Sequence, residues 1–252
     1  MNSIYEQLIT KSRNGIKSFA VLLDPDKLDS TSLKNIIKLS KESNVDYFFL
    51  GGSLLSKYNL SEIVQTIKEQ ISVPIVLFPG SHLQVEATAD AILLLSLISG
   101  RNADFLIGQH VVAAPIIKQS NLEVLPTGYL LVDCGKQTTA SYISNTTPLP
   151  YDKPSIAAAT AMAGEMLGLK LMYLDGGSGA MQPISIQTIQ AVKESIACPL
   201  IVGGGLNSEE KAAAALDAGA DLIVVGTGIE SNPALLVQIS KKVAAYNKLI
   251  RN

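Results

Sequence analysis

The chain has 252 residues, of which 47% are hydrophobic and 17% are charged. A chain of this length and composition can bury one large core, and its small charged fraction argues against disorder. Its formal net charge is −2, whereas a protein that binds a nucleic-acid backbone normally carries a basic face. We therefore expect no nucleic-acid partner. A phosphorylated small molecule stays compatible with this charge, because helix N-termini and metal ions supply positive potential locally.

The cysteines and the N-terminal segment indicate where the protein works. Cys134 and Cys198 lie in separate apolar segments and form no ligand pair, which is typical of reduced, buried cysteines in a cytosolic protein. Residues 1–15 are polar and amphipathic, without the apolar core of a signal peptide. The longest apolar stretch, residues 91–98, is far shorter than the roughly 20 residues needed to span a bilayer. We expect a soluble, cytoplasmic protein with no transmembrane segment.

Eight short apolar runs recur along the chain, with helical patterns between them. The runs are continuous rather than alternating, which is typical of parallel strands covered on both faces. Strands and helices that alternate at this spacing predict βαβ units and, with eight strands, a single (β/α)₈ TIM-barrel domain over residues 1–252. The expected strands are 19–23, 47–50, 75–78, 91–95, 129–132, 171–174, 200–202 and 222–225, and the expected helices include 33–41, 63–71, 106–119, 184–196 and 209–218, with N-caps at Ser32, Ser61 and Ser208.

One connection is too short for a full helix. Only 12 residues lie between Phe78 and Ala91, and they begin with Pro79 and Gly80. We therefore expect a modified barrel in which the helix after the third strand is shortened or replaced. The outer ring of helices should be thin there and leave a groove beside the barrel mouth for an elongated ligand.

Glycine-rich turns follow the last two expected strands. In a barrel, functional groups come from the carboxyl ends of the strands, and residues 203–205 and 226–228 stand at two such ends, each before a helix. Bare backbone amides and helix N-termini at these positions can surround a phosphate, although glycine is also common in any tight turn. Two such turns at the expected barrel positions favour a phosphate-binding site.

Two oxygen-bearing side chains end the first two strands. Asp24 follows the first strand and Ser53 follows the second, so we expect them to be neighbours at the barrel mouth. Mg²⁺ takes few protein oxygens and completes its shell with water and phosphate, so this pair is a candidate Mg²⁺ site. The alternative for Asp24 is a turn or capping carboxylate, a role that Asp26 or Asp29 can also fill.

The strand-end motifs together are specific for one family. They are LLDPDK (22–27), FLGGS (49–53), LFPGS (77–81), SLISGRNADFLIGQHVVAAP (96–115), YLDGGSGA (173–180), IVGGGL (201–206) and VVGTGI (224–229). Over almost its whole length the chain resembles the geranylgeranylglyceryl phosphate synthases, prenyltransferases that join sn-glycerol 1-phosphate to a polyprenyl diphosphate. The shortened connection after the third strand also matches the modified barrel of that family.

The resemblance implies roles for individual residues. Asp24 and Ser53 match the family's Mg²⁺ ligands. The other matches are Tyr173, Leu174, Asp175, Gly176, Gly177, Ser178 and Gly179 in the glycerol-phosphate loop, and Gly204, Gly205, Gly226 and Thr227 in the phosphate cup. The family usually carries Glu where this chain has Asp175, and Asn where it has Thr227. Both replacements keep the hydrogen-bonding type and change the reach or strength of the side chain.

The implied reaction ionises an allylic diphosphate while the glycerol C3 hydroxyl attacks. Diphosphate leaves readily only when its charge is neutralised, which is the task of the metal. Asp175 is then the candidate catalytic residue that accepts the hydroxyl proton or holds the alcohol in line; the alternative is a strand-end carboxylate that binds loop amides. Lys27 and Arg101 are candidate diphosphate partners or solvated surface charges. His82 and His110 have no ligand-like spacing and are interpreted as structural.

Two other kinds of function stay open: another enzyme with the same phosphate cup, such as a phosphosugar isomerase or an aldolase, and a non-catalytic barrel. A phosphosugar isomerase would use a carboxylate or cysteine pair across the mouth, for which Asp24 with Asp133 or Asp175 is available. An aldolase would need a Schiff-base lysine at a strand end, whereas Lys170 precedes its strand. A non-catalytic barrel would bind a phosphate or a lipid without turnover.

The resemblance also bears on the donor and on assembly. A C20 prenyl tail needs a long apolar channel, and we expect it to leave the mouth past the third and fourth strands, where Leu83, Val85 and Leu106 lie. This route places the diphosphate at Asp24 and favours geranylgeranyl diphosphate over shorter donors. The resemblance implies a homo-oligomer, a dimer or a hexamer, for which residues 142–163 are a candidate exposed patch.

Overall fold

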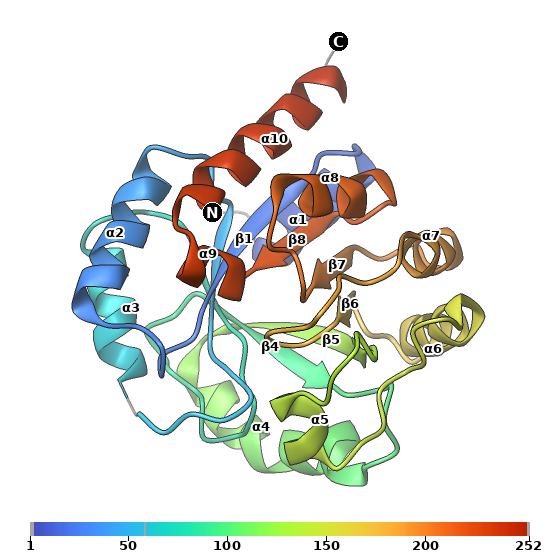
Figure 1. The fold of residues 1–252 in the computed structure, drawn as a ribbon. Helices are drawn as coiled ribbons and strands as arrows, with labels where there is room; N and C mark the ends of the chain where they lie inside the picture. Colours follow the sequence, from blue (N-terminus) through green and yellow to red (C-terminus); the bar gives the residue numbers. More distant parts are fainter. Residues whose placement is uncertain (1–2, 58, 251–252) are drawn as a thin grey trace.

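The computed structural model describes residues 3–57 and 59–250, which form a closed barrel of eight parallel strands surrounded by helices (Figure 1). Each strand pairs with the next one along the chain, and the last pairs with the first. The strands are β1 (Ser18–Leu23), β2 (Tyr47–Leu50), β3 (Ile75–Leu77), β4 (Ala91–Ser96), β5 (Glu123–Leu131), β6 (Leu171–Asp175), β7 (Leu200–Gly203) and β8 (Leu222–Val225). The predicted TIM barrel is confirmed.

The strands read as continuous apolar runs because both of their faces are covered. Successive side chains of a strand point to opposite faces. On β1, Phe19 and Val21 belong to the large apolar cluster between barrel and helices, whereas Ala20 belongs to a second cluster inside the barrel. The inner cluster continues through Phe49 on β2 and Tyr173 on β6. The barrel interior is therefore a packed core.

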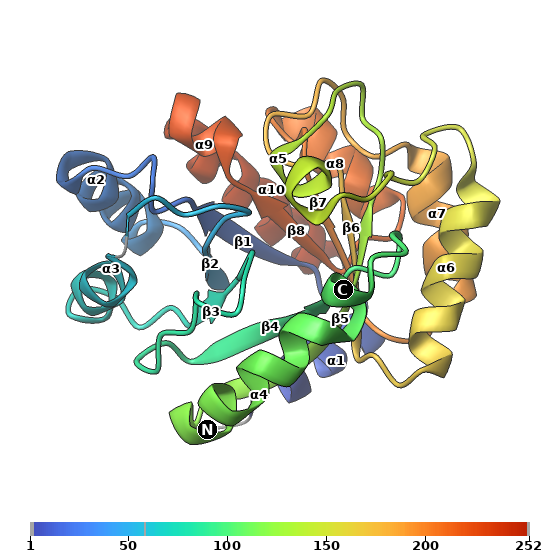
Figure 2. The ribbon, with the colours of Figure 1, turned by 90° about the horizontal axis from the view of Figure 1, so that it is seen from below.

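Helix α1 (Ile4–Arg13) closes the end of the barrel opposite the site described below. Its buried residues Ile4 and Leu8 pack into the inner cluster. The Glu123 carboxylate at the start of β5 accepts hydrogen bonds from the Ile4 and Tyr5 amides, at 2.6 and 2.8 Å. Figure 2 shows α1 at the opposite end of the barrel from α5 and α9. The other end of the barrel is consequently the open mouth.

The outer ring follows the predicted helices, with small shifts at their starts. It contains α2 (Ser30–Lys41), α3 (Leu60–Lys68), α4 (Gln109–Ser120), α6 (Pro154–Met166), α7 (Ile186–Ser195), α8 (Glu209–Asp217) and α10 (Ala234–Ile250), with the short α5 (Thr139–Ser144) and α9 (Thr227–Ser231). Ser208 caps α8 as predicted. The predicted caps Ser32 and Ser61 are wrong: Asp29 caps α2 through the Ser32 amide, and α3 follows Asn59.

The connection from β3 to β4 contains no helix, as its length predicted. The chain passes from Leu77 to Ala91 through turns, and Figure 2 shows this loop between α3 and α4. The longer connection after β4 begins with a π-helical turn, Asp104–Gly108, that leads directly into α4. In the part of the chain that the structure describes, no helix combines the length and the apolar character needed to cross a membrane.

Candidate active site

The ends of seven of the eight strands, or the loops that follow them, line one polar cavity at the barrel mouth. The predicted site residues that line it are Asp24, Ser53, Tyr173, Asp175, Gly177, Ser178, Gly179, Gly204, Gly205, Gly226 and Thr227, together with the candidate Lys27. Leu174 and Gly176 lie in the same segment but not on the cavity wall. Leu174 points outward into the layer between barrel and helices, and Gly176 packs beside Cys134. The structure thus brings the residues of five separate motifs together.

The turn after β7 packs backbone against backbone on the loop after β6. Gly204 has a φ of +82°, and a Cβ atom added there would lie 2.6 Å from the Gly176 nitrogen. Gly205 has a φ of +71°, with its added Cβ 2.6 Å from the Gln182 carbonyl oxygen. A side chain at either position is excluded by conformation and by contact. These glycines let the two loops approach closely enough to form one wall of the cavity.

The turn after β8 completes this part of the wall. The Gly226 carbonyl accepts the amides of Ile229 and Glu230, at 2.8 and 3.1 Å, which starts helix α9. The first amides of a helix have no acceptor within the helix, so those at the start of α9 are available to an anion. The Thr227 hydroxyl lies 3.4 Å from that of Ser178, across from the β6 loop. Three glycine-rich segments therefore converge into a cup of backbone amides.

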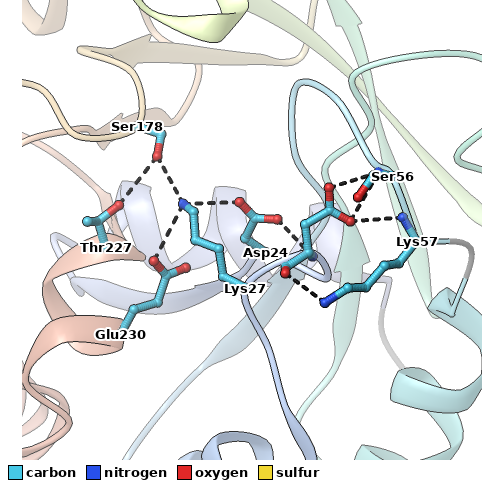
Figure 3. Close-up of polar contacts among 8 residues, drawn as sticks. Asp24, Lys27, Ser56, Lys57, Ser178, Thr227 and Glu230 are labelled. Atoms are coloured by element: carbon cyan, nitrogen blue, oxygen red, sulfur yellow. Dashed lines mark hydrogen bonds and ion pairs between the residues drawn. The ribbon is translucent and has the colours of Figure 1, made fainter.

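Lys27 lies between the cup and the β1 end of the cavity (Figure 3). Its ammonium is 3.1 Å from Asp24 Oδ2 and 3.5 Å from Glu230 Oε2, and it donates a 3.3 Å hydrogen bond to the Ser178 hydroxyl. Burial alone would lower the pKa of Lys27, but the two carboxylates raise it above its usual value. Among the described residues that line the cavity, Lys27 is the one basic side chain, and it stays charged. Arg101 instead donates to the Ile98 and Gly100 carbonyls and lines no part of this cavity.

Asp24 is oriented by its own turn. Its Oδ1 accepts the Asp26 amide at 3.1 Å, while Asp26 holds the amides of Ser56 and Lys57 in the next loop (Figure 3). A Cβ atom added at Gly52 would lie 3.5 Å from Asp24 Oδ1, so the segment that carries Ser53 passes beside this carboxylate. The loop-holding role falls to Asp26 and the capping role to Asp29, which leaves Asp24 facing the cavity.

The oxygen donors near Asp24 suit a metal that keeps most of its own shell. Within residues 3–57 and 59–250, no group of three His, Cys, Asp or Glu side chains is placed to hold a metal ion. A cation at Asp24 and Ser53 would therefore have one carboxylate and one hydroxyl from the protein. Mg²⁺ is commonly bound through one or two carboxylates plus substrate phosphates and water, so the donor set fits Mg²⁺ and not a caged metal.

Asp175 ends β6 and is 7% exposed. Both of its oxygens are held: Oδ2 accepts the Tyr129 hydroxyl at 2.5 Å, and Oδ1 accepts the Gly177 amide at 2.7 Å. Burial raises the pKa of Asp175 above its usual value, against the lowering effect of these two hydrogen bonds. The carboxylate thus does bind a loop amide, and it also faces the cavity with a raised proton affinity.

A second, apolar cavity begins where the β3–β4 loop replaces a helix. Its wall comes from β4, α4, α5 and that loop, and includes Phe78, Val85, Ile92, Leu94, Leu97, Phe105, Ala113, Ile117 and Tyr129. The predicted groove is therefore confirmed beside the third and fourth strands. Two details differ, because Leu83 is 63% exposed and Leu106 does not line the cavity. Gly52, Ser53, Phe78, Tyr129 and Ala140 line both cavities, so the two meet at the barrel mouth.

Sequence reasoning missed several residues of these walls. Phe78 ended an expected strand, which was a usable signal. Tyr129 was the first residue of its expected strand, and only the longer β5 of the structure places it near the mouth. Glu230 follows the Gly226 turn by one helical turn, which would have placed it at the mouth. His82 and His110 line the apolar cavity, where His82 Nδ1 pairs with Gln109 and His110 Nε2 with Ser96. Burial lowers the pKa of His110, which favours its neutral form.

The barrel mouth combines a cup of backbone amides, the carboxylates of Asp24, Asp175 and Glu230, and an apolar cavity. This combination defines a TIM-barrel enzyme that handles a phosphorylated substrate beside an apolar one. The model of the PcrB family matches residues 9–245, and the chain belongs to that family. It is 57% identical to a geranylgeranylglyceryl phosphate synthase of Spirosoma linguale, over 94% of this chain and 95% of the relative. The corresponding synthase of Chitinophaga pinensis is 51% identical over 99% of each chain.

A solved structure matches equally well in shape. The (S)-3-O-geranylgeranylglyceryl phosphate synthase of Thermoplasma acidophilum, determined in complex with its substrate sn-glycerol-1-phosphate, superposes with a TM-score of 0.90. The two sequences are 30% identical, and the match covers 96% of this chain and 99% of the other. The family resemblance seen in the strand-end motifs is thereby confirmed.

Proposed function

We propose that this protein is a prenyltransferase that forms an ether bond between the C3 hydroxyl of sn-glycerol 1-phosphate and a polyprenyl diphosphate, with release of diphosphate. The observation that carries the proposal is the meeting of the two cavities. The polar cavity offers a phosphate cup and the apolar cavity offers room for a hydrocarbon tail, and five residues are common to both walls. The acceptor hydroxyl and the first carbon of the donor would therefore lie side by side.

The acceptor fits the polar cavity at its β6–β8 side. Its phosphate would bind the amides of Gly204, Gly205 and Thr227, with the glycerol along the loop from Tyr173 to Gly179. The named substrate of the Thermoplasma acidophilum relative supports this acceptor. A phosphate here needs no large basic patch, because backbone amides and Lys27 supply the positive potential.

The donor head group would lie at the β1–β2 side. Asp24 and Ser53 would hold Mg²⁺, which when bound neutralises charge on the diphosphate and so makes it a better leaving group. Lys27 adds a fixed positive charge between the two substrates, since Asp24 and Glu230 keep its ammonium in place. The prenyl tail would lie in the apolar cavity lined by Phe78 and extend outward past β3 and β4.

Ether formation requires one bond to break and one to form. The bond between the allylic carbon and the diphosphate oxygen breaks, and its electron pair leaves with the diphosphate. A lone pair of the glycerol C3 oxygen forms the new carbon–oxygen bond, and the hydroxyl proton passes to Asp175. The raised pKa of Asp175 brings its proton affinity closer to the working pH, which favours general-base catalysis.

The competing enzyme classes find less support. An isomerase pair of Asp24 with Asp133 is disfavoured because Asp133 lines neither cavity. An aldolase needs a lysine that is neutral enough to attack a carbonyl. Lys27 is held as an ammonium ion by two carboxylates, and Lys170 precedes β6, at the closed end of the barrel.

We also propose a cytoplasmic location and a homo-oligomer, dimeric or hexameric. The reduced, buried cysteines are compatible with the first. Large exposed apolar side chains on and beside α5 and α6 support the second: Tyr142, Ile156, Met166 and Leu167. Part of this surface is the patch that the sequence indicated at residues 142–163.

The function is tested by incubating the protein with labelled sn-glycerol 1-phosphate, Mg²⁺ and prenyl diphosphates of 10, 15 or 20 carbons. We expect transfer of the label into a product that partitions into organic solvent, and geranylgeranyl diphosphate should outcompete the shorter donors. Each buried methylene contributes about 0.8 kcal/mol, so an extra prenyl unit has a large effect on kcat/KM. Binding of both substrates without turnover would favour a non-catalytic barrel. Equal kcat/KM for all donors would contradict selection of chain length by the apolar cavity.

Gly226→Ala probes the phosphate cup. Gly226 has no positive φ, and its added Cβ would meet the Leu22 side chain at 3.2 Å, so the change perturbs the cup without the backbone conflict present at Gly204. We expect KM for glycerol 1-phosphate to rise about tenfold, the scale of one weakened hydrogen bond to a charged group. KM for the prenyl donor should change less. Equal increases for both substrates, with a lower Tm, would indicate general damage.

A further inference from the structure

Tyr129 is the residue that connects the two cavities to the candidate base. It lies on β5, its side chain is part of the wall of both cavities, and its hydroxyl donates to Asp175 Oδ2 at 2.5 Å. Its ring meets Phe78 and Tyr173 at centroid distances of 5.9 and 5.5 Å, edge-on in both cases. The ring is therefore fixed by aromatic neighbours, and the direction of its hydroxyl follows from the ring.

Two donors from different parts of the chain fix the Asp175 carboxylate. Gly177 belongs to the loop that follows Asp175 itself, and its amide holds Oδ1. Tyr129 belongs to the neighbouring strand and holds Oδ2. A carboxylate can accept about four hydrogen bonds, so lone pairs on both oxygens stay available to a substrate hydroxyl. The loop bond alone would move with the loop, whereas the bond from Tyr129 ties the carboxylate to the barrel wall.

We propose that Tyr129 is a positioning residue that holds Asp175 Oδ2 at the junction of the two cavities and sets the pH range in which this carboxylate accepts the acceptor's proton. The proposal rests on the proposed prenyl transfer and deepens it. Asp175 is one methylene shorter than Glu, so a fixed direction matters more for its reach. Tyr129 acts on the reaction through Asp175, without itself taking the proton.

The electrostatic surroundings of Asp175 make this role measurable. Among the described residues, its charge is felt by Tyr129 on β5, Tyr173 on β6 and Cys134 in the segment after β5. Burial raises the pKa of the Cys134 thiol to about 12, and the pKa values of both tyrosines lie well above their usual range, so all three groups are neutral at working pH. The hydrogen bond from Tyr129 favours the ionised carboxylate and lowers its pKa. Removing that bond must move the pKa of Asp175 upward.

Tyr129→Phe is the direct test, because it keeps the ring and removes the hydroxyl. We expect kcat to fall about 10- to 100-fold, the scale of a hydrogen bond to a charged group. KM for glycerol 1-phosphate should change little. The base must be ionised to act, so the rate falls on the acid side of its pKa. The acid limb of the kcat/KM profile should therefore shift to higher pH in the variant.

Tyr47→Phe is the matched control. Tyr47 is also a buried tyrosine of the inner cluster, but its hydroxyl has no hydrogen-bond partner in the part of the chain that the structure describes. It lines neither cavity. This variant should keep the wild-type rate and the wild-type pH profile. A shift of the acid limb in both variants would contradict a specific role for Tyr129.

A second variant keeps the hydrogen bond and should shift the acid limb in the opposite direction, so its result does not depend on whether Tyr129→Phe folds. Tyr129→3-fluorotyrosine keeps size and hydroxyl but makes the phenol a stronger donor, so the acid limb should move to lower pH. An unchanged acid limb in the fluorinated protein, or in a folded Tyr129→Phe variant that is less active, would overturn the proposal. Failure of the proposed function is distinct, since the wild-type protein would then transfer no prenyl group to glycerol 1-phosphate at any pH.

Discussion

Asp175→Asn is expected to lower kcat by roughly 10²- to 10⁴-fold, the contribution of a well-placed general base. The amide is nearly isosteric, and its oxygen can still accept the Gly177 amide, so the fold and the binding of glycerol 1-phosphate should survive. What disappears is a group that can take the proton of the C3 hydroxyl. The measurement is kcat with both substrates saturating, with Tm and KM for glycerol 1-phosphate as checks on the fold.

Asp133→Asn is the matched control for this change. Asp133 also follows a strand at the barrel mouth, but its carboxylate binds the Gly135 amide and lines neither cavity. It should keep nearly full activity. Asp175→Glu, which restores the residue that the family usually carries, should also be tolerated. A full-rate Asp175→Asn variant would reduce Asp175 to a strand-end residue that orders its loop.

The barrel and the general place of the site could be predicted from the sequence for a topological reason. Parallel strands covered on both faces give continuous apolar runs, and a closed barrel brings all eight carboxyl ends to one mouth. Asp24 and Thr227 are thus near one another in space once both are recognised as strand ends. The missing helix after β3 also follows from chain length, since the connecting residues are too few to form one and return.

The strand β5 shows where local pattern is insufficient. It begins at Glu123, six residues before the predicted start at Tyr129. Glutamate, proline and glycine are poor strand formers, and in residues 123–128 they interrupt the strand signal of Val124 and Thr127. Tertiary contacts hold them instead: Glu123 binds the start of α1, and the Pro126 carbonyl accepts the Lys170 amide at 2.8 Å. Such partners are far away in sequence and leave no local pattern.

The side-chain contacts around the site are a second feature that could not be predicted from the sequence. The position of Lys27 between Asp24, Ser178 and Glu230 depends on side-chain conformations and on segments up to 203 residues apart. The sequence could offer Lys27 and Arg101 only as equal candidates, and the structure separates them. The proposed role of Tyr129 could not be predicted either. A tyrosine in a strand is ordinarily interpreted as a core residue, and only the structure shows that its hydroxyl binds the Asp175 carboxylate.

Asp24→Asn is expected to lower kcat/KM for the prenyl donor by roughly 10²- to 10³-fold. Charge neutralisation at a leaving diphosphate contributes several kcal/mol, and each 1.36 kcal/mol is a factor of ten in rate. The neutral amide keeps the size of the side chain and its bond to the Asp26 amide, but it removes the negative charge that would attract Mg²⁺. Binding of glycerol 1-phosphate should stay nearly intact, because the cup lies across the cavity at the β6–β8 side. Isothermal titration with Mg²⁺ and a non-ionisable diphosphate analogue gives a second readout besides turnover.

Asp26→Asn is the matched control, because it distinguishes loss of a metal ligand from loss of the hydrogen bonds that hold the neighbouring loop. Asp26→Asn weakens the hydrogen bonds to the Ser56 and Lys57 amides, yet Asp26 lines neither cavity. If Asp24 binds the metal at the diphosphate, Asp26→Asn should lower Tm slightly and leave the Mg²⁺ dependence unchanged. Asp24→Asn should instead keep Tm and change the Mg²⁺ dependence. Near wild-type activity of Asp24→Asn at saturating Mg²⁺ would contradict the metal assignment. In that case Lys27, freed from one of its two carboxylates, would be the group that neutralises the leaving diphosphate.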